Sequence, residues 1–334
     1  MRLVQLYHPT FGRRVALVEA AQLRLLHDFT SIYDLALKAI AEGGSLTNLI
    51  QAKVSNELLD YDLIYQGQSA WQLLPAFDHP INPNACMLSG TGLTHKASAD
   101  NRQQMHEAAK EETLTDSMKM YLWGVEGGHP PSGEIGIQPE WFYKGNGTLL
   151  RGHGAALPVP PYADDGGEEP EIAGIYVVDP SGKPWRVGFA TANEFSDHVM
   201  ERKNYLYLAP SKLRCCAIGP ELTIRPGLQA LSGKVRIYRQ SEILWEKAIQ
   251  TGEANMSHSI ANLEYHHFKY ANHLCPGQVH IHFFGADAFS FGEKIQLADG
   301  DRMEVYWEGM GRPLQNTLAV VQGAAPFVKV AILT

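Results

Sequence analysis

The sequence lacks the features that mark membrane and exported proteins. It contains no run of about 18 or more apolar residues, so no segment is predicted to span a membrane. The segment Met1–Pro9 lacks the apolar core of a signal peptide. No Cys-x-x-Cys motif is present, and a reducing compartment fits the four cysteines, Cys86, Cys215, Cys216 and Cys275. We therefore expect a cytoplasmic protein without a membrane partner.

An excess of positive charge is also absent. The chain has 28 lysines and arginines against 36 acidic residues, which gives a net charge of -8. Because binding to nucleic acid needs clustered cations, we expect no nucleic-acid partner. The apolar fraction of 45% and the charged fraction of 19% are typical of a globular protein with a large core.

The organisation of the chain is a small front section followed by a long body, with no internal repeat. A length of 334 residues favours about two domains, or one large domain with a small appendage. The proline-rich connection Asp78–Asn84 predicts a boundary between a small mixed α/β domain, residues 1–77, and a larger domain, residues 83–334. Helical patterns are predicted in the front section at Leu17–Leu26 and Ile32–Ala41.

The body is predicted to be rich in β-strands. From Trp141 onward, short apolar runs alternate with glycine and proline, which is typical of an antiparallel or mixed sheet. The predicted strands are Ile172–Val178, Val187–Ala192, Val235–Tyr238, Val279–Phe284 and Met303–Trp307. Helices are expected around residues 98–120 and 257–272, and a loop over residues 124–139. The predicted fold class is therefore α+β, with a β-rich body and a small N-terminal α/β section.

An acidic pair stands at the head of one predicted strand. Glu169 and Glu171 are two positions apart before an apolar, β-branched run, so their side chains share a face if the segment is a strand. Two like charges this close need a cation or solvent. Oxygen ligands suit Mg²⁺, Mn²⁺ or Ca²⁺. The alternative is a solvated acidic loop, since Asp164, Asp165 and Glu168 lie just upstream.

Two further charged residues follow downstream. Glu194 ends a strand-like run, and its alternative role is a charge or cap at a helix N-terminus. Lys212 lies among apolar neighbours and close to Pro210. It is either a surface lysine whose stem covers apolar surface, or a buried cation that balances the acidic residues.

The order of these residues resembles the motifs of the fumarylacetoacetate hydrolase superfamily. The acid-x-acid motif of that family corresponds to Glu169-Pro170-Glu171, and its Gly-Tyr-Thr-x-x-Asn-Asp motif corresponds to Gly188–Glu194. Its lysine and its Leu-Gly-Pro segment correspond to Lys212 and Ile218-Gly219-Pro220. Two earlier motifs correspond to Gly92–Ala99, which contains His95, and to Pro139–Lys144. The resemblance covers about residues 83–320 and implies a catalytic domain with a mixed β-sandwich or roll.

The resemblance implies roles for individual residues. The implied metal ligands are Glu169, Glu171 and Glu194, with Mg²⁺ as the cofactor and Mn²⁺ or Ca²⁺ as alternatives. The implied catalytic residues are Lys212, His95 and Glu194. The implied substrate-binding residues are Lys144, Ser196 and His198.

The sequence departs from the family at several of these motifs. Glu194 stands where the family has aspartate, His198 where it has arginine, and Cys215 where it has aspartate. The segment His282–Ala286 replaces a Thr-Gly-Thr motif. These differences concern the substrate and the reaction, and they leave an acidic residue at each implied metal-binding position.

The implied chemistry follows from these groups. A cation held by three carboxylates keeps open positions that a 2-keto carboxylate can fill, and it then polarises the keto oxygen and stabilises an enolate. Lys212 and His95 are the candidates for moving the C3 proton. A hydroxyl at C4 would leave as water, whereas a second carbonyl would favour hydration and C–C cleavage.

Within the superfamily, segments such as Gly166–Gly174 and Asn204–Leu213 resemble a sugar-acid branch. This branch is similar to 2-keto-3-deoxy-pentonate dehydratases, which yield 2,5-dioxopentanoate in the non-phosphorylative breakdown of pentoses. The resemblance implies a lyase that acts on a small 2-keto sugar acid and assembles as a homodimer or higher homo-oligomer. The alternatives are a C–C hydrolase of a 2,4-diketo-3-deoxy sugar acid, and a sugar-acid-binding module without catalytic activity.

Histidines form a second group of candidate metal ligands. His280-Ile281-His282 on a predicted strand is similar to the His-x-His ligands of cupins, but no glutamate follows at the usual offset. The other candidates lie on or near the predicted helix at residues 257–272: His258, His266, His267 and His273. These four lack a His-Glu-x-x-His motif, so a packing role is favoured over zinc binding.

Overall fold

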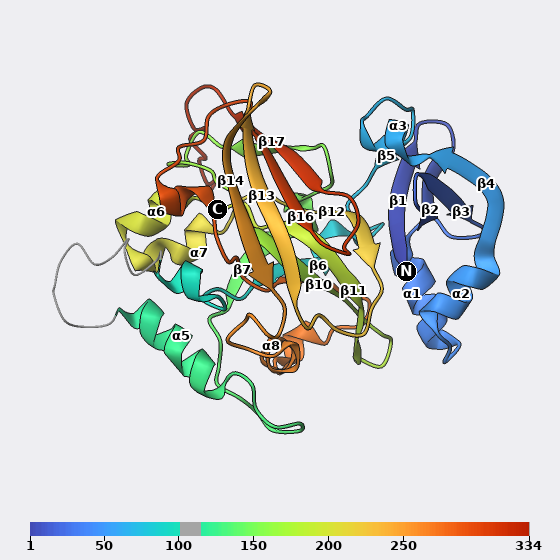
Figure 1. Ribbon diagram of the computed structural model, residues 1–334, viewed down its shortest axis with the longest axis horizontal. Coiled ribbons are helices and arrows are strands. Elements are labelled where there is room, and N and C mark those ends of the chain that lie inside the picture. Colours follow the sequence, from blue (N-terminus) through green and yellow to red (C-terminus); the bar gives the residue numbers. More distant parts are fainter. Residues whose placement is uncertain (101–114, 334) are drawn as a thin grey trace.

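The computed structural model describes residues 1–100 and 115–333. Their strands form a 12-stranded sheet and a 5-stranded sheet, both of mixed direction, with short helices around them (Figure 1). The predicted α+β class with a β-rich body is confirmed. In the described part of the chain, no helix is long and apolar enough to cross a membrane.

The front section contributes one end of the large sheet. Its strands are β1 (Arg2–His8), β2 (Gly12–Glu19), β3 (Gln22–Leu26), β4 (Val54–Asp60) and β5 (Gln72–Leu73). Its helices are α1 (Ile32–Ala41), α2 (Leu46–Lys53) and α3 (Tyr61–Tyr65). Strands β1 to β4 pair in order and antiparallel, and β5 pairs with β1. This section lies at one side of the molecule (Figure 1).

The two helices predicted for the front section had different outcomes. The prediction at Ile32–Ala41 is confirmed: Ser31 caps α1 by accepting a hydrogen bond from the Asp34 backbone N–H at 3.1 Å. The prediction at Leu17–Leu26 is wrong, because this segment is the hairpin of β2 and β3. Its turn contains Ala20 at φ 55° and no glycine, so the usual sequence signal of a tight turn is missing.

The body completes the large sheet. Its strands there are β6 (Cys86–Gly90), β7 (Phe142–Asn146), β8 (Leu150–Arg151), β10 (Pro170–Val178), β11 (Pro184–Asn193), β12 (Cys216–Thr223) and β15 (Val279–Phe283). The order across the sheet is β4-β3-β2-β1-β12-β11-β10-β15-β6-β7. Strands β10 and β11 form an antiparallel hairpin, and every residue of β10 is buried.

The small sheet covers one face of the body. Its strands are β9 (Ala156–Val159), β13 (Leu231–Arg239), β14 (Glu242–Thr251), β16 (Arg302–Trp307) and β17 (Leu314–Val320), in the order β14-β13-β16-β17-β9. A buried apolar cluster between the sheets joins Ile172 and Phe189 of the hairpin to Val235 and Val305. The hairpin is therefore covered on this face by the small sheet, and a second cluster with Ala173 and Ile175 lies on its other face.

The remaining helices of the body are α5 (Asp116–Gly127), α6 (His198–Lys203), α7 (Leu208–Ser211) and α8 (Ile260–Phe268). Short 3₁₀ segments are η1 (Pro83–Ala85), η2 (Gly147–Leu149), η3 (Tyr205–Tyr207), η4 (Ala271–His273) and η5 (Ser290–Glu293). The helix predicted around residues 257–272 is present as α8. The helix predicted around residues 98–120 lies largely outside the described residues.

The loop predicted over residues 124–139 starts too early, because α5 continues to Gly127. Gly124 lies inside this helix for a packing reason. A Cβ atom there would lie 2.7 Å from His258 Nε2 and 2.9 Å from Ser257 Oγ, so only glycine allows this close contact. The helix ends at Gly127, with Gly128 as its C-cap residue.

The front section and the body share one apolar cluster. Leu3 and Ile32 of the front section pack with Ala173 and Ile281 of the body in that cluster. Strand β1 also pairs with β12, in the register Arg2↔Thr223 and Leu3↔Leu222. A division into domains between residues 77 and 83 stays a prediction.

A buried carboxylate at this junction contacts both sections. Glu221 of β12 accepts a hydrogen bond from the Tyr61 hydroxyl at 2.9 Å, and the Arg2 guanidinium lies 3.1 Å from its other oxygen. The backbone N–H of Arg312 also donates to Glu221 at 3.0 Å. Because a buried charge without partners is costly, these contacts tie the first strand and α3 to the body.

We predict that Tyr61→Phe destabilises the protein by about 1.5–3 kcal/mol, because it removes a hydrogen bond to a buried charged group. The free energy of unfolding in urea is the measurement. Tyr7→Phe is the matched control, since Tyr7 is 40% exposed. Equal stability of the Tyr61→Phe variant and the wild type would contradict this role for the junction.

Candidate metal centre and active site

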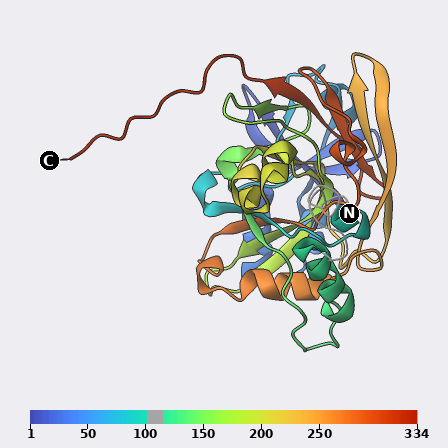
Figure 2. The same ribbon diagram turned by 90° about the vertical axis from the view of Figure 1, so that its left-hand side faces the viewer.

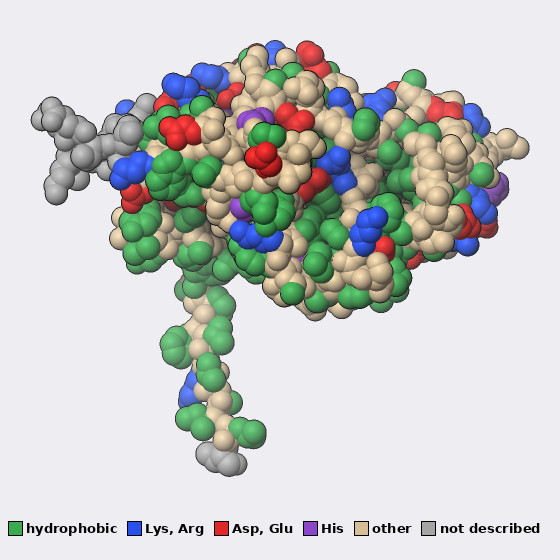
Figure 3. Space-filling view, turned by 90° about the horizontal axis from the view of Figure 1, so that it is seen from below, with side chains coloured by type: hydrophobic (Ala, Val, Ile, Leu, Met, Phe, Trp, Pro, Cys, Tyr) green, Lys and Arg blue, Asp and Glu red, His purple; other side chains and the backbone are tan. Residues whose placement is uncertain are grey.

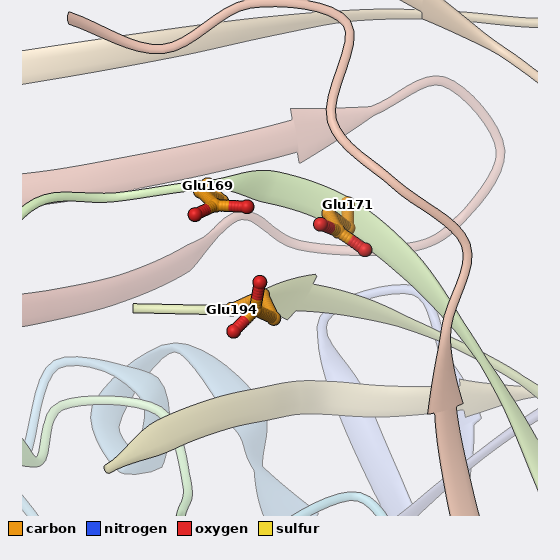
Figure 4. Close-up of side chains that lie close together, drawn as sticks. All are labelled: Glu169, Glu171 and Glu194. Carbon is orange, nitrogen blue, oxygen red and sulfur yellow. The ribbon is translucent and has the colours of Figure 1, made fainter. Parts of the chain in front are cut away.

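Three glutamates meet at the open end of the β10–β11 hairpin. Glu171 lies in β10, Glu169 directly precedes this strand, and Glu194 directly follows β11. The backbone N–H of Glu194 donates to the carbonyl of Glu169 at 2.9 Å, which fixes the two ends of the hairpin beside each other. One carboxylate oxygen from each residue lies within 4.8 Å of the others, and the three side chains point toward a common space (Figure 4).

The acidic group is buried, which removes the alternative of a solvated loop. Glu169 is 9% exposed, Glu171 1% and Glu194 0%. Glu168 is also fully buried: its carboxylate accepts hydrogen bonds from the Ser290 backbone N–H at 2.6 Å and from the Ser290 hydroxyl at 2.8 Å. Burial of this many carboxylates requires positive charge nearby.

Two buried lysines supply that charge. Lys212, the C-cap residue of α7, donates to Glu169 Oε1 at 2.5 Å and to Glu194 Oε2 at 2.7 Å. Lys144 of β7 lies 2.6 Å from the other oxygen of Glu194. Lys144 also donates to the carbonyls of Phe195 and Lys212, at 2.5 and 2.9 Å, and so holds both segments in place. Lys212 is therefore a buried cation and not a surface lysine.

The surroundings shift the pKa values of the carboxyl groups in different directions. Burial raises the pKa of Glu171 well above its ordinary value, and the charges of Glu194 and Glu169 add to this effect. Burial and the charge of Glu169 raise the pKa of Glu194 to about 7. Burial would also raise the pKa of Glu169, but the Lys212 ammonium and His198 hold it well below its usual range. The lysines thus balance part of the negative charge through ion pairs with Glu169 and Glu194, and the ion pairs of the described residues include none between a lysine and Glu171.

The lysine in this group is held in its charged form. Burial would lower the pKa of Lys212, but the charges of Glu169 and Glu194 raise it well above the ordinary value. In this arrangement the Lys212 ammonium group donates hydrogen bonds to one oxygen on each of two candidate metal ligands, Glu169 and Glu194.

Backbone and hydroxyl groups orient the carboxylates. Gly285 donates its backbone N–H to Glu171 Oε2 at 2.7 Å. A Cβ atom at Gly285 would lie 2.1 Å from Thr94 Oγ1, and its φ is 95°, so this position requires glycine. Ser196 donates its hydroxyl to the Glu194 side chain at 3.0 Å. Ser196, assigned to substrate binding from the sequence, thus contacts the acidic group itself.

His198 joins the site from the start of α6. Its Nε2 lies 3.1 Å from Glu169 Oε1, and its ring stacks on Phe289 and Phe291 with centroid distances of 4.9 and 5.1 Å. Its Nδ1 is buried and has no hydrogen-bond partner among the described residues. A small pocket of about 20 Å³ is lined by Glu169, Glu171, His198, Gly285 and Phe289 among others. This volume is about that of one water-sized sphere, which suits a metal ion or a single small ligand group.

His95 is the one sequence-predicted site residue that the structure keeps apart from this group. Its ring nitrogens lie 2.9 Å from Thr94 Oγ1 and 3.2 Å from Thr251 Oγ1. In the described residues, no hydrogen bond joins it to the three glutamates. Thr94, its neighbour, donates to the Phe284 carbonyl at 2.6 Å, directly before Gly285. His95 therefore supports the segment that orients Glu171.

Sequence reasoning gave no role to three residues that the structure places in the site. Glu168 anchors the loop that carries Phe289, Gly285 orients Glu171, and Phe289 stacks on His198. Glu168 adjoins the acidic pair in sequence, which was a usable signal. Gly285 and Phe289 lie more than ninety residues after Glu194 in the chain, and only the pairing of β10 with β15 brings their loop to the hairpin.

A cluster of histidines lies elsewhere in the body. A hydrogen bond of 2.9 Å joins Nε2 of His267 in α8 and Nδ1 of His280 in β15. The ring centroids of His267 and His282 lie 4.6 Å apart. Both ring nitrogens of His282 are occupied, by the hydroxyls of Ser89 and Thr91 at 2.9 and 2.8 Å. In the part of the chain that the structure describes, only the three glutamates bring three possible metal-ligating atoms together. The histidine cluster is a packing group.

No protein-family model matches the chain, and no curated protein matches it by sequence. Several solved structures do resemble it. A hexagonal crystal form of 2-keto-3-deoxyarabinonate dehydratase is 20% identical with a TM-score of 0.70, and the match covers 97% of this chain and 100% of the other. A 2-keto-3-deoxy-D-arabinonate dehydratase complexed with magnesium and 2,5-dioxopentanoate is 20% identical with a TM-score of 0.69 and the same coverage.

A second group of similar structures consists of isomerases. A 5-carboxymethyl-2-hydroxymuconate delta-isomerase from Mycobacterium smegmatis is 15% identical with a TM-score of 0.57, and the match covers 96% of this chain and 100% of the other. At these identities the likeness establishes the fold. The chain has the fold of the fumarylacetoacetate hydrolase superfamily, and the resemblance predicted from its motifs is confirmed at that level.

The histidine cluster predicts how stability depends on pH. Burial and the neighbouring imidazoles lower the pKa values of His280 and His282 to about 3, whereas an unfolded histidine has a pKa of about 6.5. The unfolded chain therefore binds more protons than the folded one between these values. We predict that the free energy of unfolding falls as pH decreases from about 6.5 to 4, by up to about 1.4 kcal/mol per pH unit for each histidine.

Urea unfolding at several pH values measures this slope. His282→Gln should make the slope shallower, while His27→Gln should leave it unchanged, because the His27 side chain is exposed. A slope equal to that of the wild type in the His282→Gln variant would show that His282 is not a source of the acid sensitivity.

Proposed function

We propose that this protein is a metal-dependent enzyme that acts on a small 2-keto sugar acid. The observation that carries the proposal is the group formed by Glu169, Glu171 and Glu194: three buried carboxylates whose oxygens lie within 4.8 Å of one another. Surface acidic clusters need no cation, but a buried group of this kind does. The fold likeness to a dehydratase complexed with magnesium supports the same assignment.

The donor set fits a hard divalent cation. All three ligands are carboxylates, which favours Mg²⁺, with Mn²⁺ or Ca²⁺ as alternatives. Burial and the charges of Glu194 and Glu169 raise the pKa of Glu171, so the lysines alone do not keep this carboxyl group ionised, and a bound cation would take the place of its proton. Mg²⁺ held there would supply a Lewis acid that polarises a 2-keto group and makes the neighbouring C3 protons more acidic.

The reaction we assign is the loss of water from a 2-keto-3-deoxy pentonate to give 2,5-dioxopentanoate. Two observations support dehydration. Two of the similar structures, with TM-scores of 0.70 and 0.69, are dehydratases. The lysine beside the carboxylates is also held as an ammonium, which is the form needed to protonate a leaving hydroxyl.

Lys212 is the central proton-transfer residue in this proposal. Its ammonium donates to Glu169 and Glu194, so a substrate that approaches these carboxylates also approaches a proton donor. Glu194 completes the catalytic group, because Lys212 and Lys144 both contact its carboxylate. His95 is the second candidate for proton transfer, and its contacts with Thr94 and Thr251 suit a positioning role better.

The remaining residues orient the substrate and the ligands. The unpartnered Nδ1 of His198 is a hydrogen-bonding group available for a substrate oxygen. Lys144 and Ser196 contact Glu194 from two sides and fix its position. We assign Lys144, Ser196 and His198 to the substrate region on these contacts, with Lys144 and Ser196 acting through Glu194.

We predict that Glu171→Gln abolishes Mg²⁺ binding and turnover, because it removes one of three charged ligands from a buried site. Titration calorimetry with Mg²⁺ measures binding. Mass spectrometry of C5 and C6 2-keto-3-deoxy sugar acids, incubated with protein and Mg²⁺, measures turnover. The wild-type product should be lighter than its substrate by one water.

Glu57→Gln is the control for Glu171→Gln, since Glu57 is an exposed glutamate of β4. Wild-type activity that survives removal of divalent ions by a chelator would refute the metal-dependent proposal. Cleavage with gain of one water would identify the C–C hydrolase instead. Binding of Mg²⁺ and of the keto acid without any product would identify a binding module.

We predict that Lys212→Met lowers turnover by about 10²–10⁴-fold, the usual contribution of a general acid or base. Nuclear magnetic resonance in deuterated water measures exchange of the substrate C3 protons, which should be lost as well, because in this proposal the same lysine takes the C3 proton as an amine and gives it to the leaving hydroxyl as an ammonium. Lys203→Met is a matched control, because Lys203 is an exposed lysine that pairs with Asp164. Exchange at the wild-type rate in Lys212→Met would move the proton-transfer role to His95.

A further inference from the structure

The part of the chain that the structure describes ends in an apolar arm, residues 324–333, which is exposed along its whole length. After β17, the Val321 backbone N–H donates to the Val159 carbonyl at 3.0 Å, and every residue from 320 to 333 is exposed. From Gly323 onward the arm runs away from the body in an extended course (Figures 2 and 3). At about 3.3 Å per residue, residues 324–333 reach about 30 Å from their root.

The composition of the arm is that of a buried strand. Its large apolar side chains are 79–102% exposed: Phe327, Val328, Val330, Ile332 and Leu333. Lys329 is the only charged side chain between Val320 and Leu333. Exposed segments of this kind, with high β-propensity and little charge, promote aggregation unless another surface covers them.

A groove that fits such a segment lies at the root of the arm. It has a volume of about 710 Å³, and its lining includes Val159, Ala163, Ile295, Leu297 and Val321. Asp164 and Asp165 line it as well, together with Arg202 and Lys294. Asp164 already pairs with Lys203 at 2.6 Å, so Asp165 is the acidic group of the lining that has no lysine or arginine partner among the described residues. The arm extends away from the body (Figure 2), and the lining of the groove ends at Gly323, so residues 324–333 do not line the groove of their own chain.

We propose that the arm of one copy of this chain lies in the groove of a second copy, and that the arm of the second copy lies in the groove of the first. Arm and groove occur side by side on every copy, so a two-fold exchange covers both arms and both grooves and closes the assembly. Lys329 then lies near Asp164 and Asp165 of the other chain. Two arms with five large apolar side chains each provide an interface of the order of 1,200–2,000 Å², the usual size for a stable pair.

The exchange also brings the second copy to the candidate active site. His198 lines both this groove and the small pocket beside Glu169 and Glu171. The arm of one copy therefore borders the wall that carries His198 in the other. This inference concerns assembly alone and holds whether or not the proposed reaction is correct.

Sedimentation of the full chain over a range of concentrations is the first test. We expect a closed pair, and we expect Val330→Asp, or a chain that ends at Gly323, to raise its dissociation constant at least about tenfold. Ile81→Asp is the matched control, because Ile81 is 87% exposed but lies outside the arm. Circular dichroism checks that each variant is folded. A monomeric full chain, an unlimited series of larger species, or unchanged dissociation of the arm variants would overturn the proposal.

Cross-linking is the second test, and it distinguishes exchange from folding back. In a Cys275→Ser background, chains carrying Val330→Cys are mixed with separately prepared chains carrying Leu297→Cys, since Cys275 is the exposed cysteine. A disulfide between the two different chains supports the exchange. If a bond forms only when both substitutions are in one chain, the arm covers its own groove and the proposal fails.

Discussion

The mutual repulsion of three buried carboxylates is the constraint on which the site depends. Glu169, Glu171 and Glu194 are placed together by the register of one hairpin, and their charge is tolerable only because Lys212 and Lys144 are buried beside them. Each lysine holds more than one group: Lys144, for example, also bonds the carbonyls that follow Glu194 and Lys212. Charge balance therefore determines the course of the backbone around the site as well as its chemistry.

This balance explains why residues from distant parts of the chain meet here. Lys144 comes from β7 at the edge of the large sheet, Lys212 from the end of α7, and Gly285 from the loop after β15. Burial and the neighbouring carboxylates raise the pKa values of Glu171 and Glu194, so the two lysines alone do not keep all three carboxyl groups ionised. A divalent cation bound here would take the place of the protons on these groups.

The fold is shared with structures that are only 15–20% identical to this chain. Such divergence is compatible with one architecture because a core tolerates exchange of apolar residues when volume and pattern are kept. The pattern here is simple: β10 is buried at every position and lies between two apolar clusters. The polar residues of the site are far less exchangeable, since each charge has a specific partner. They carry the proposed reaction, and the fold likeness to a dehydratase supports it.

The sequence by itself determined the strand-rich body, the helix at Ile32–Ala41 and the acidic pair on one strand, because periodicity and capping are local properties. It did not determine the hairpin at Leu17–Leu26, whose turn lacks glycine, or the continuation of α5 to Gly127. Tertiary structure decided three other features. They are the ion pairs of Lys212 and Lys144, the hydrogen bonds of the His95 ring with Thr94 and Thr251, and the hydrogen bond from Gly285 to Glu171. These partners meet only through tertiary folding: Gly285 lies 114 positions from Glu171, and Lys212 lies 43 positions from Glu169, so no local pattern encodes their contacts.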